Sequence, residues 1–266
     1  MKYIIICLSV ITFALIGCKK EQPKPTTNNN PSSTGTLEVK FRAEKFVLGE
    51  PFYIGRDRKA VLDEFKHYVS SLVAVKENGE TVSIQDVALV DFAQSNKTSH
   101  GDGITFSMKL PVGKYKGIRF RVGLDSLTNH GDPAKYTESH PLSTFKNMHW
   151  TWKSGYKFTV MEGKVDASAT GGQMYPTTAF SYHTGTDELA FTQDYSDKNE
   201  YAFDVKKDDF THFVVEWRAD QIFTNDTEII DVRDPNNLFT HSFPATMPLS
   251  RLVNAQLKRA MSAYVE

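Results

Sequence analysis

Residues 36–42 have the sequence TLEVKFR, in which apolar and polar side chains alternate without a break. Leu37, Val39 and Phe41 fall on one side of an extended chain, and the charged residues between them fall on the other. A period of two is typical of a half-buried β-strand. The stretch therefore predicts a sheet with one face covered by a core.

Further strand-like stretches follow, separated by turn residues. The clearest turn signals are Asn78-Gly79, typical of a hairpin, and Pro111-Val112-Gly113. Helical spacing of apolar residues is weak until Leu249–Met261, which follows Pro248. This pattern predicts an all-β fold: an antiparallel β-sandwich of jelly-roll or Greek-key type with a short C-terminal helix. The predicted strands are residues 36–46, 68–75, 84–92, 104–110, 117–124, 148–162, 179–183, 200–205 and 211–219.

The first thirty-five residues have a different composition. Lys2 precedes a short apolar run, and Leu15-Ile16-Gly17-Cys18 has the form of a lipobox. The run is too short to span a membrane and is typical of a signal peptide. We therefore expect residues 1–17 to be a lipoprotein signal peptide and Cys18 to carry the lipid; the alternative is an ordinary secretory signal that contains a cysteine.

The segment after Cys18 lacks apolar residues as far as Gly35. Such a composition cannot bury enough surface to fold, so residues 18–35 are predicted to be a lipidated, disordered tether. Residues 36–266 then form the folded domain. Lys19 is compatible with transport to the outer membrane. We expect the domain to be anchored there, facing the periplasm or the cell surface.

Cysteine content and charge exclude several function classes. The two cysteines are Cys7 and Cys18, so the predicted domain has no thiol. Disulfides, cysteine-based zinc sites and a cysteine nucleophile are therefore excluded from it. The formal net charge of -1 argues against nucleic acid as a main partner.

Two stretches place histidines beside aromatic residues. In the predicted strand from Met148, Trp150 and Trp152 share one face and His149 lies on the other. In residues 179–185, His183 lies opposite the apolar face. If the two strands pair, His149 and His183 share a face and could bind copper or zinc. The alternative is that the tryptophans fill the core and the histidines are ordinary surface residues.

Loop histidines are the remaining candidates. His130, His140 and His241 lie among turn residues, where binding sites are often built, although turn residues with nothing to bind are equally compatible with the pattern. The chain lacks a Gly-x-Ser-x-Gly elbow, a His-Glu-x-x-His motif and a phosphate-binding glycine-rich loop. We therefore expect no enzymatic activity.

The combination of these motifs resembles the MbnP-like family. The resemblance covers the chain from about Thr36 to the C-terminal helix, and its most specific part is Trp-x-Trp-x-x-Gly-Tyr. The stretches that carry it are residues 110–125, 140–142, 148–158, 162–163, 180–185 and 240–242.

The resemblance implies a periplasmic or surface-exposed β-sandwich that binds copper. It also implies a partner di-haem enzyme of the MauG type, which oxidises a tryptophan to kynurenine. By this resemblance Trp150 or Trp152 is the modified residue, and at least one of the two should lie near the surface beside a histidine. The implied ligand candidates are His149, His183, His140 and His241.

Two other functions fit the same composition. A glycan-binding lipoprotein would use exposed Trp or Tyr side chains as a flat platform for sugars. An adhesive surface module would need no convergence of histidines and tryptophans. The position of the aromatic side chains discriminates between these hypotheses.

Overall fold

The computed structural model describes residues 33–44, 46–94, 103–151, 153, 155–224 and 229–266. Residues 33–266 belong to one compact unit. The predicted signal peptide, Cys18 and most of the predicted tether lie outside the described residues, as does Trp152.

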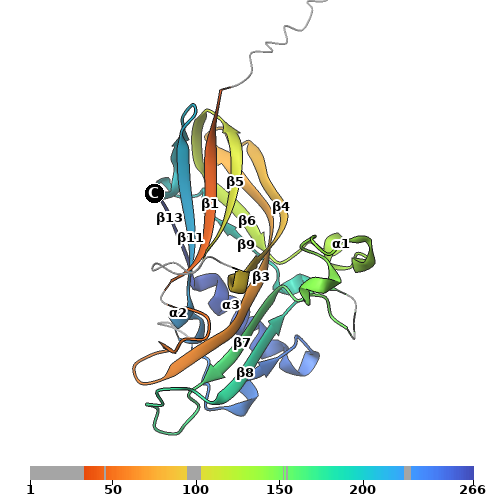
Figure 1. Ribbon diagram of the computed structural model, residues 1–266, viewed down its shortest axis with the longest axis vertical. Coiled ribbons are helices and arrows are strands. Elements are labelled where there is room, and N and C mark those ends of the chain that lie inside the picture. Colours follow the sequence, from red (N-terminus) through yellow and green to blue (C-terminus); the bar gives the residue numbers. More distant parts are fainter. Residues whose placement is uncertain (1–32, 45, 95–102, 152, 154, 225–228) are drawn as a thin grey trace, which may run out of the picture. The chain divides into compact units, whose positions relative to one another are not determined.

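Two sheets form within the described part of the chain (Figure 1). The smaller contains, in spatial order, β13 (Met261–Val265), β11 (Phe210–Arg218), β1 (Thr34–Glu44) and β5 (Gly103–Pro111). The larger contains β10 (Phe203–Val205), β6 (Gly113–Val122), β3 (Lys59–Lys76), β7 (Thr159–Val165), β8 (Thr178–Thr184) and β12 (Phe239–Thr240). Alongside these, β2 (Phe52–Tyr53) and β4 (Thr81–Asp91) pair with β3, and β9 (Phe191–Asp194) pairs with β6.

Short helices connect the strands. The α-helices of the described residues are α1 (Ser126–Asn129), α2 (Ala219–Phe223) and α3 (Met247–Arg259). The 3-10 helices there are η1 (Phe92–Gln94), η2 (Pro133–Lys135), η3 (Thr144–Lys146), η4 (Asp187–Leu189), η5 (Asn199–Tyr201), η6 (Pro235–Asn237) and η7 (Pro244–Thr246). None of the helices among the described residues is long and apolar enough to cross a membrane.

The predicted β-sandwich is confirmed. Leu37, Val39 and Phe41 of β1 are all fully buried in the core between the sheets. Burial of each such side chain stabilises the fold by about 1.5–3 kcal/mol. Most strand pairs are antiparallel, but β1 pairs with β11 in parallel, and so does β12 with β8.

The predicted C-terminal helix is confirmed as α3, but it ends earlier than the apolar spacing predicts. Met261 belongs to β13, which pairs with β11 and closes the edge of the smaller sheet. The backbone N–H of Ala260 bonds to the Gln256 carbonyl, and the chain then becomes extended. Edge pairing on β11 therefore determines the conformation of the last residues.

Strand β3 connects the sandwich to the region that carries the candidate site. Its first half pairs with β7, and its second half pairs with β4 and β6. The register shifts near Ser71, which has φ of +51°, so the strand bends between the two halves. Figure 1 shows β7 and β8 extending the larger sheet along the first half of β3. The sequence predicted only the second half, because charged residues interrupt the alternation before Tyr68.

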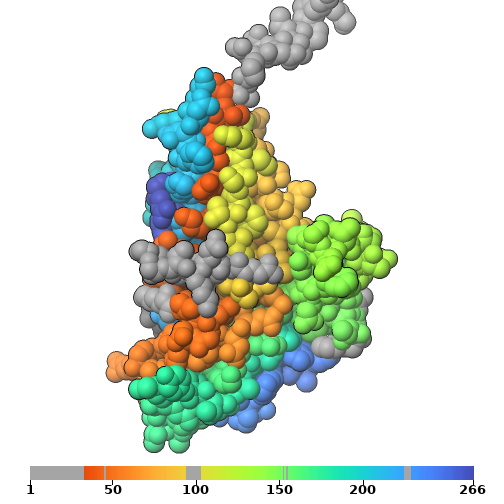
Figure 2. All heavy atoms as spheres, viewed as in Figure 1, coloured from red at the N-terminus to blue at the C-terminus, as the bar shows by residue number. Residues whose placement is uncertain are grey.

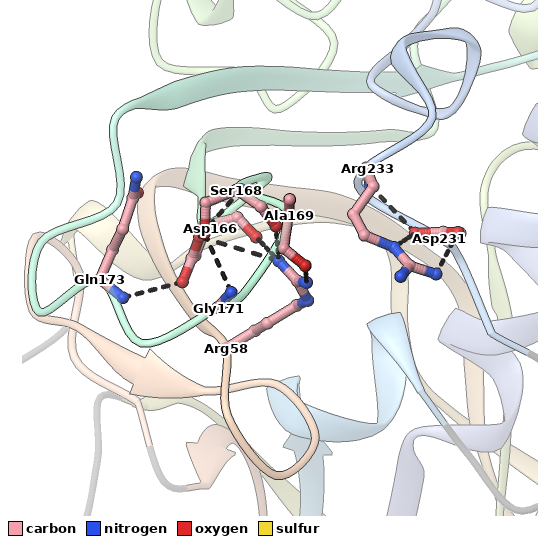
Figure 3. A network of polar contacts seen from close by, with 8 residues as sticks. All are labelled: Arg58, Asp166, Ser168, Ala169, Gly171, Gln173, Asp231 and Arg233. Atoms are coloured by element: carbon pink, nitrogen blue, oxygen red, sulfur yellow. Dashed lines mark hydrogen bonds and ion pairs between the residues drawn. The ribbon is translucent and has the colours of Figure 1, made fainter.

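A polar network holds the loop between β7 and β8 (Figure 3). The carboxylate of Asp166 is fully buried and accepts hydrogen bonds from the Ser168 backbone, the Ser168 hydroxyl and the Gln173 backbone. Arg58 donates to the carbonyls of Asp166 and Ser168 at 2.8 and 2.7 Å. These bonds fix the far ends of β7 and β8.

Candidate functional site

Residues 148–150 and 155–157 run antiparallel as the two arms of a hairpin, so the prediction of one continuous strand from residue 148 is wrong. The Trp150 N–H donates to the Gly155 carbonyl at 3.0 Å, and the Lys157 N–H donates to the Met148 carbonyl at 2.6 Å. Gly155 has φ of +100°, a conformation that strains residues with a Cβ. The chain therefore reverses here, and β7 begins only at Thr159.

Glycine also allows this hairpin to lie against the end of β8. A Cβ on Gly185 would lie 2.2 Å from the carbonyl oxygen of Tyr156. The Phe158 N–H donates to the Thr184 carbonyl at 2.6 Å. This close contact brings Trp150 beside His183 on β8. Figure 2 shows the lobe that carries α1 projecting from one side of the larger sheet.

His183 and His241 form a stacked pair. Parallel pairing of β12 with β8 aligns Thr240 with Tyr182, so the next residues of the two strands are also neighbours. The two imidazole centroids are 4.6 Å apart, and the ring planes differ by 8°. The Ser242 hydroxyl donates to the His183 carbonyl at 3.2 Å, which holds the two segments together.

Trp150 packs against both rings of this histidine pair. Its ring centroid lies 6.2 Å from that of His183 and 6.2 Å from that of His241. The Lys153 ammonium lies 4.5 Å from the indole centroid, and the Lys157 ammonium lies 5.8 Å from it. We call these five residues, together with Glu162, the Trp150 site.

The carboxylate of Glu162 forms a hydrogen bond with Nε2 of His183. Its Oε1 is 2.5 Å from His183 Nε2, and the Ser181 hydroxyl donates to the same oxygen at 3.3 Å. The pairing of β7 with β8 places Glu162 opposite Ser181 and Val160 opposite His183. The three polar side chains therefore share the face of the sheet that lies away from the main core.

Burial and charge keep both imidazoles neutral. Burial lowers the pKa of His183; Lys157 and His241 lower it further, and Glu162 opposes them. Burial also lowers the pKa of His241, with added repulsion from Lys157 and Lys153. A neutral imidazole offers a nitrogen lone pair, which is the form that binds metals. The site therefore presents two uncharged nitrogen ligands at neutral pH.

The other predicted ligands lie against tyrosines. The His149 ring contacts Tyr156 edge-on at 5.0 Å, and the His140 ring stacks on Tyr136 at 4.2 Å. His140 Nδ1 also accepts a hydrogen bond from the Leu142 N–H at 3.1 Å. The expected pairing of His149 with His183 on one sheet face is not observed, because the hairpin interrupts the predicted strand.

Three members of the site are not apparent from the sequence. Lys153 and Lys157 alternate with His149 on the outer face of the predicted strand, yet Lys157 is only 8 % exposed because its ammonium group lies over the Trp150 ring. Glu162 shows no pattern of its own. The one available signal was the glycine at position 155, which marks the reversal that brings the lysines over the indole.

Trp150 itself is only 2 % exposed. It lies beside two histidines, as predicted, but it is buried beneath the lysine side chains, so the prediction of a position near the surface is wrong for Trp150; Trp152 lies outside the described residues. Within the described residues, no group of three or more His, Cys, Asp or Glu side chains could hold a metal ion. A metal at the Trp150 site would therefore rely on the two imidazoles as its nitrogen ligands.

Comparison with known proteins identifies a relative. Residues 33–241, more than half of the 266-residue chain, match the MbnP family model. A similar solved structure is MbnP from Methylosinus trichosporium, with 18 % sequence identity and a TM-score of 0.53. The similarity covers 87 % of this chain and 99 % of that chain, and it shows a common fold. A search of curated proteins found no match.

Proposed function

Because the chain belongs to the MbnP family, we propose that it is an exported lipoprotein that binds copper for metal handling or acquisition. The ligands in this proposal are His183 and His241. The observation that carries it is the stacking of two neutral, partly buried imidazoles 4.6 Å apart beside Trp150. Copper is the cargo here, and no turnover is required of the protein.

The donor set suits Cu(I). This ion accepts imidazole and other soft donors at low coordination number, so two nitrogens can form most of its shell. Nδ1 of His183 is buried and has no hydrogen-bond partner among the described residues. Leaving such an acceptor unsatisfied costs about 1–3 kcal/mol, a cost that a bound ion would remove.

Binding requires a rearrangement of the pair. The ring planes differ by only 8° and the centroids lie 4.6 Å apart, so the in-plane lone pairs of the two rings lie in separate, nearly parallel planes. One ring must turn before both nitrogens can reach the same ion. His241 follows directly after β12, whereas His183 lies within β8 and is bonded to Glu162, so the His241 ring is the one that we expect to turn.

Of the two candidate tryptophans, Trp150 is the one that lies within the described residues. In this proposal a di-haem partner of the MauG type oxidises it to kynurenine. Kynurenine carries an aromatic amine and a ketone, whereas indole offers only an N–H donor. The modified side chain would then add a donor beside both histidines. Trp152 stays a candidate but lies outside the described residues, as does Cys18, the proposed lipid attachment point.

The glycan-binding alternative gains no support from the described tryptophans. Trp150 and Trp217 are 2 % and 0 % exposed, so neither side chain offers a flat platform for a sugar. The adhesive alternative makes no demand on the Trp150 site. Copper binding is therefore the function that the geometry supports best.

Anaerobic Cu(I) titration against a chromophoric chelator tests the proposal. The protein should come from its native host, so that intact mass also reports any change on the peptide that holds Trp150. We expect tight binding that the double variant His183→Ala/His241→Ala loses and that the matched variant His140→Ala/His149→Ala keeps. Equal binding by the two double variants would remove the histidine pair from the proposal.

A further inference from the structure

The contact between Glu162 and His183 determines which imidazole nitrogen carries the proton. A carboxylate oxygen can only accept a hydrogen bond, and Oε1 lies 2.5 Å from Nε2 of His183. The Ser181 hydroxyl donates its one hydrogen to the same carboxylate oxygen and lies 3.2 Å from Nε2, from which it can therefore only accept. Nε2 must therefore be the protonated nitrogen.

The other nitrogen, Nδ1, is left with a bare lone pair. It is buried, and the described residues offer it no hydrogen-bond partner. The His183 side chain is 12 % exposed, so water reaches little of it. The imidazole of His241 stacks on one side of this ring, and the indole of Trp150 lies on another. The lone pair thus sits within the Trp150 site.

We propose that Glu162 is a positioning residue: by holding the proton on Nε2, it presents Nδ1 of His183 as the metal-binding nitrogen. This inference rests on the proposed function and adds to it the ligating atom and the group that selects it. Carboxylates that orient metal-binding histidines typically change metal affinity by 10- to 100-fold when they are removed. Because Nδ1 is already bare, metal binding releases no proton from His183.

If Glu162 had a purely structural role, its removal would change folding stability rather than the protonation of His183. Its side chain is 40 % exposed, and ion pairs that are exposed to this extent contribute little to folding. We therefore expect Glu162→Ala to fold. Its effect should appear in the ring of His183 and in copper affinity. Glu162→Gln keeps an oxygen that can accept from Nε2 and should recover much of the wild-type behaviour.

The first measurement uses the metal-free full chain labelled with ¹⁵N-histidine, with the His183 signals identified by their loss in His183→Gln. We expect Nε2 of the wild type to resonate as a protonated nitrogen and Nδ1 as an unprotonated one. In Glu162→Ala the two signals should move towards each other, because both tautomers become populated. Asp63→Ala, which removes a carboxylate that pairs with Lys164, should leave them unchanged.

The second measurement titrates the same variants with Cu(I) alone. We expect Glu162→Ala to bind 10- to 100-fold more weakly than the wild type and Asp63→Ala to bind equally well. A protonated Nδ1 in the wild type, or unchanged copper affinity in Glu162→Ala, would overturn the role of Glu162. Absence of copper binding in the wild type would instead overturn the proposed function, and the nitrogen signals would show this separately, because they come from metal-free protein.

Discussion

His67 gives the sharpest prediction about stability. It is fully buried in β3, and neither ring nitrogen has a hydrogen-bond partner among the described residues. The ring packs edge-on against Trp217 with centroids 4.8 Å apart. Burial lowers the pKa of His67 from 6.5 to about 3, because a charged imidazole has no compensating partner there.

The sign and size of the effect follow from this shift. Above pH 6.5 the imidazole is neutral in both the folded and the unfolded chain, so it makes no pH-dependent contribution. As the pH falls from 6.5 towards 3, the unfolded chain binds a proton that the folded chain excludes, and stability is lost. Lowering the pKa from 6.5 to about 3 corresponds to about 5 kcal/mol once the pH is below both values. At pH 4 the loss is about 3 kcal/mol.

The variant His67→Leu tests this reasoning. It removes the titrating group and two unsatisfied nitrogens, so we expect equal or higher stability at pH 7.5 and an advantage that grows by about 3 kcal/mol at pH 4. Urea unfolding of residues 33–266 at several pH values measures the difference. The control Leu72→Ala, at a fully buried position of the same strand, should lower stability by the same amount at every pH. Parallel pH curves for His67→Leu and the wild type would refute the argument.

Three other substitutions probe contacts around the site. Gly185→Ala should lower the melting temperature and weaken Cu(I) binding in the titration, because its Cβ would lie 2.2 Å from the Tyr156 oxygen. Asp166→Ala should lower the free energy of unfolding, measured in urea, by about 3–5 kcal/mol, since it leaves Arg58 and two backbone N–H groups without their buried acceptor. A loss below 1 kcal/mol would show that water replaces the carboxylate. Lys153→Met should lower the free energy of unfolding by about 0.5–1 kcal/mol, because it removes the cation–π contact with Trp150. Lys164, by contrast, contacts no aromatic ring among the described residues, so Lys164→Met should not cause this loss.

Local pattern was enough to predict the sandwich. The alternation in β1 matches its burial residue by residue, since one face of the strand packs on the main core. The position of His183 on the face away from that core was predicted in the same way, because β8 is a regular strand bounded by turn residues. In both strands, burial of one face of the sheet determines the stability of the pairing, and the alternation of apolar and polar residues in the sequence reflects that burial.

The rest of the site depends on contacts between distant segments. His241 reaches His183 through β12, which has two residues and therefore no period to detect. Lys157 alternates as an outward residue but is buried, since the chain reversal places its ammonium group over the Trp150 ring. No residue beside His67 in the sequence indicates that it is buried, and its burial comes from packing against Trp217 of β11. None of these outcomes follows from the residues on either side.

The charges of the Trp150 site bear on the metal that it could bind. Lys153 and Lys157 both repel a cation placed at the histidine pair, and Glu162 offsets part of that repulsion. Two like charges about 6 Å apart repel each other by about 3 kcal/mol at an effective dielectric constant of about 20. A divalent ion bears this repulsion twice, whereas a monovalent ion bears it once. The same lysines that keep the imidazoles neutral therefore favour Cu(I) over divalent competitors, which is consistent with the two-nitrogen donor set of the proposal.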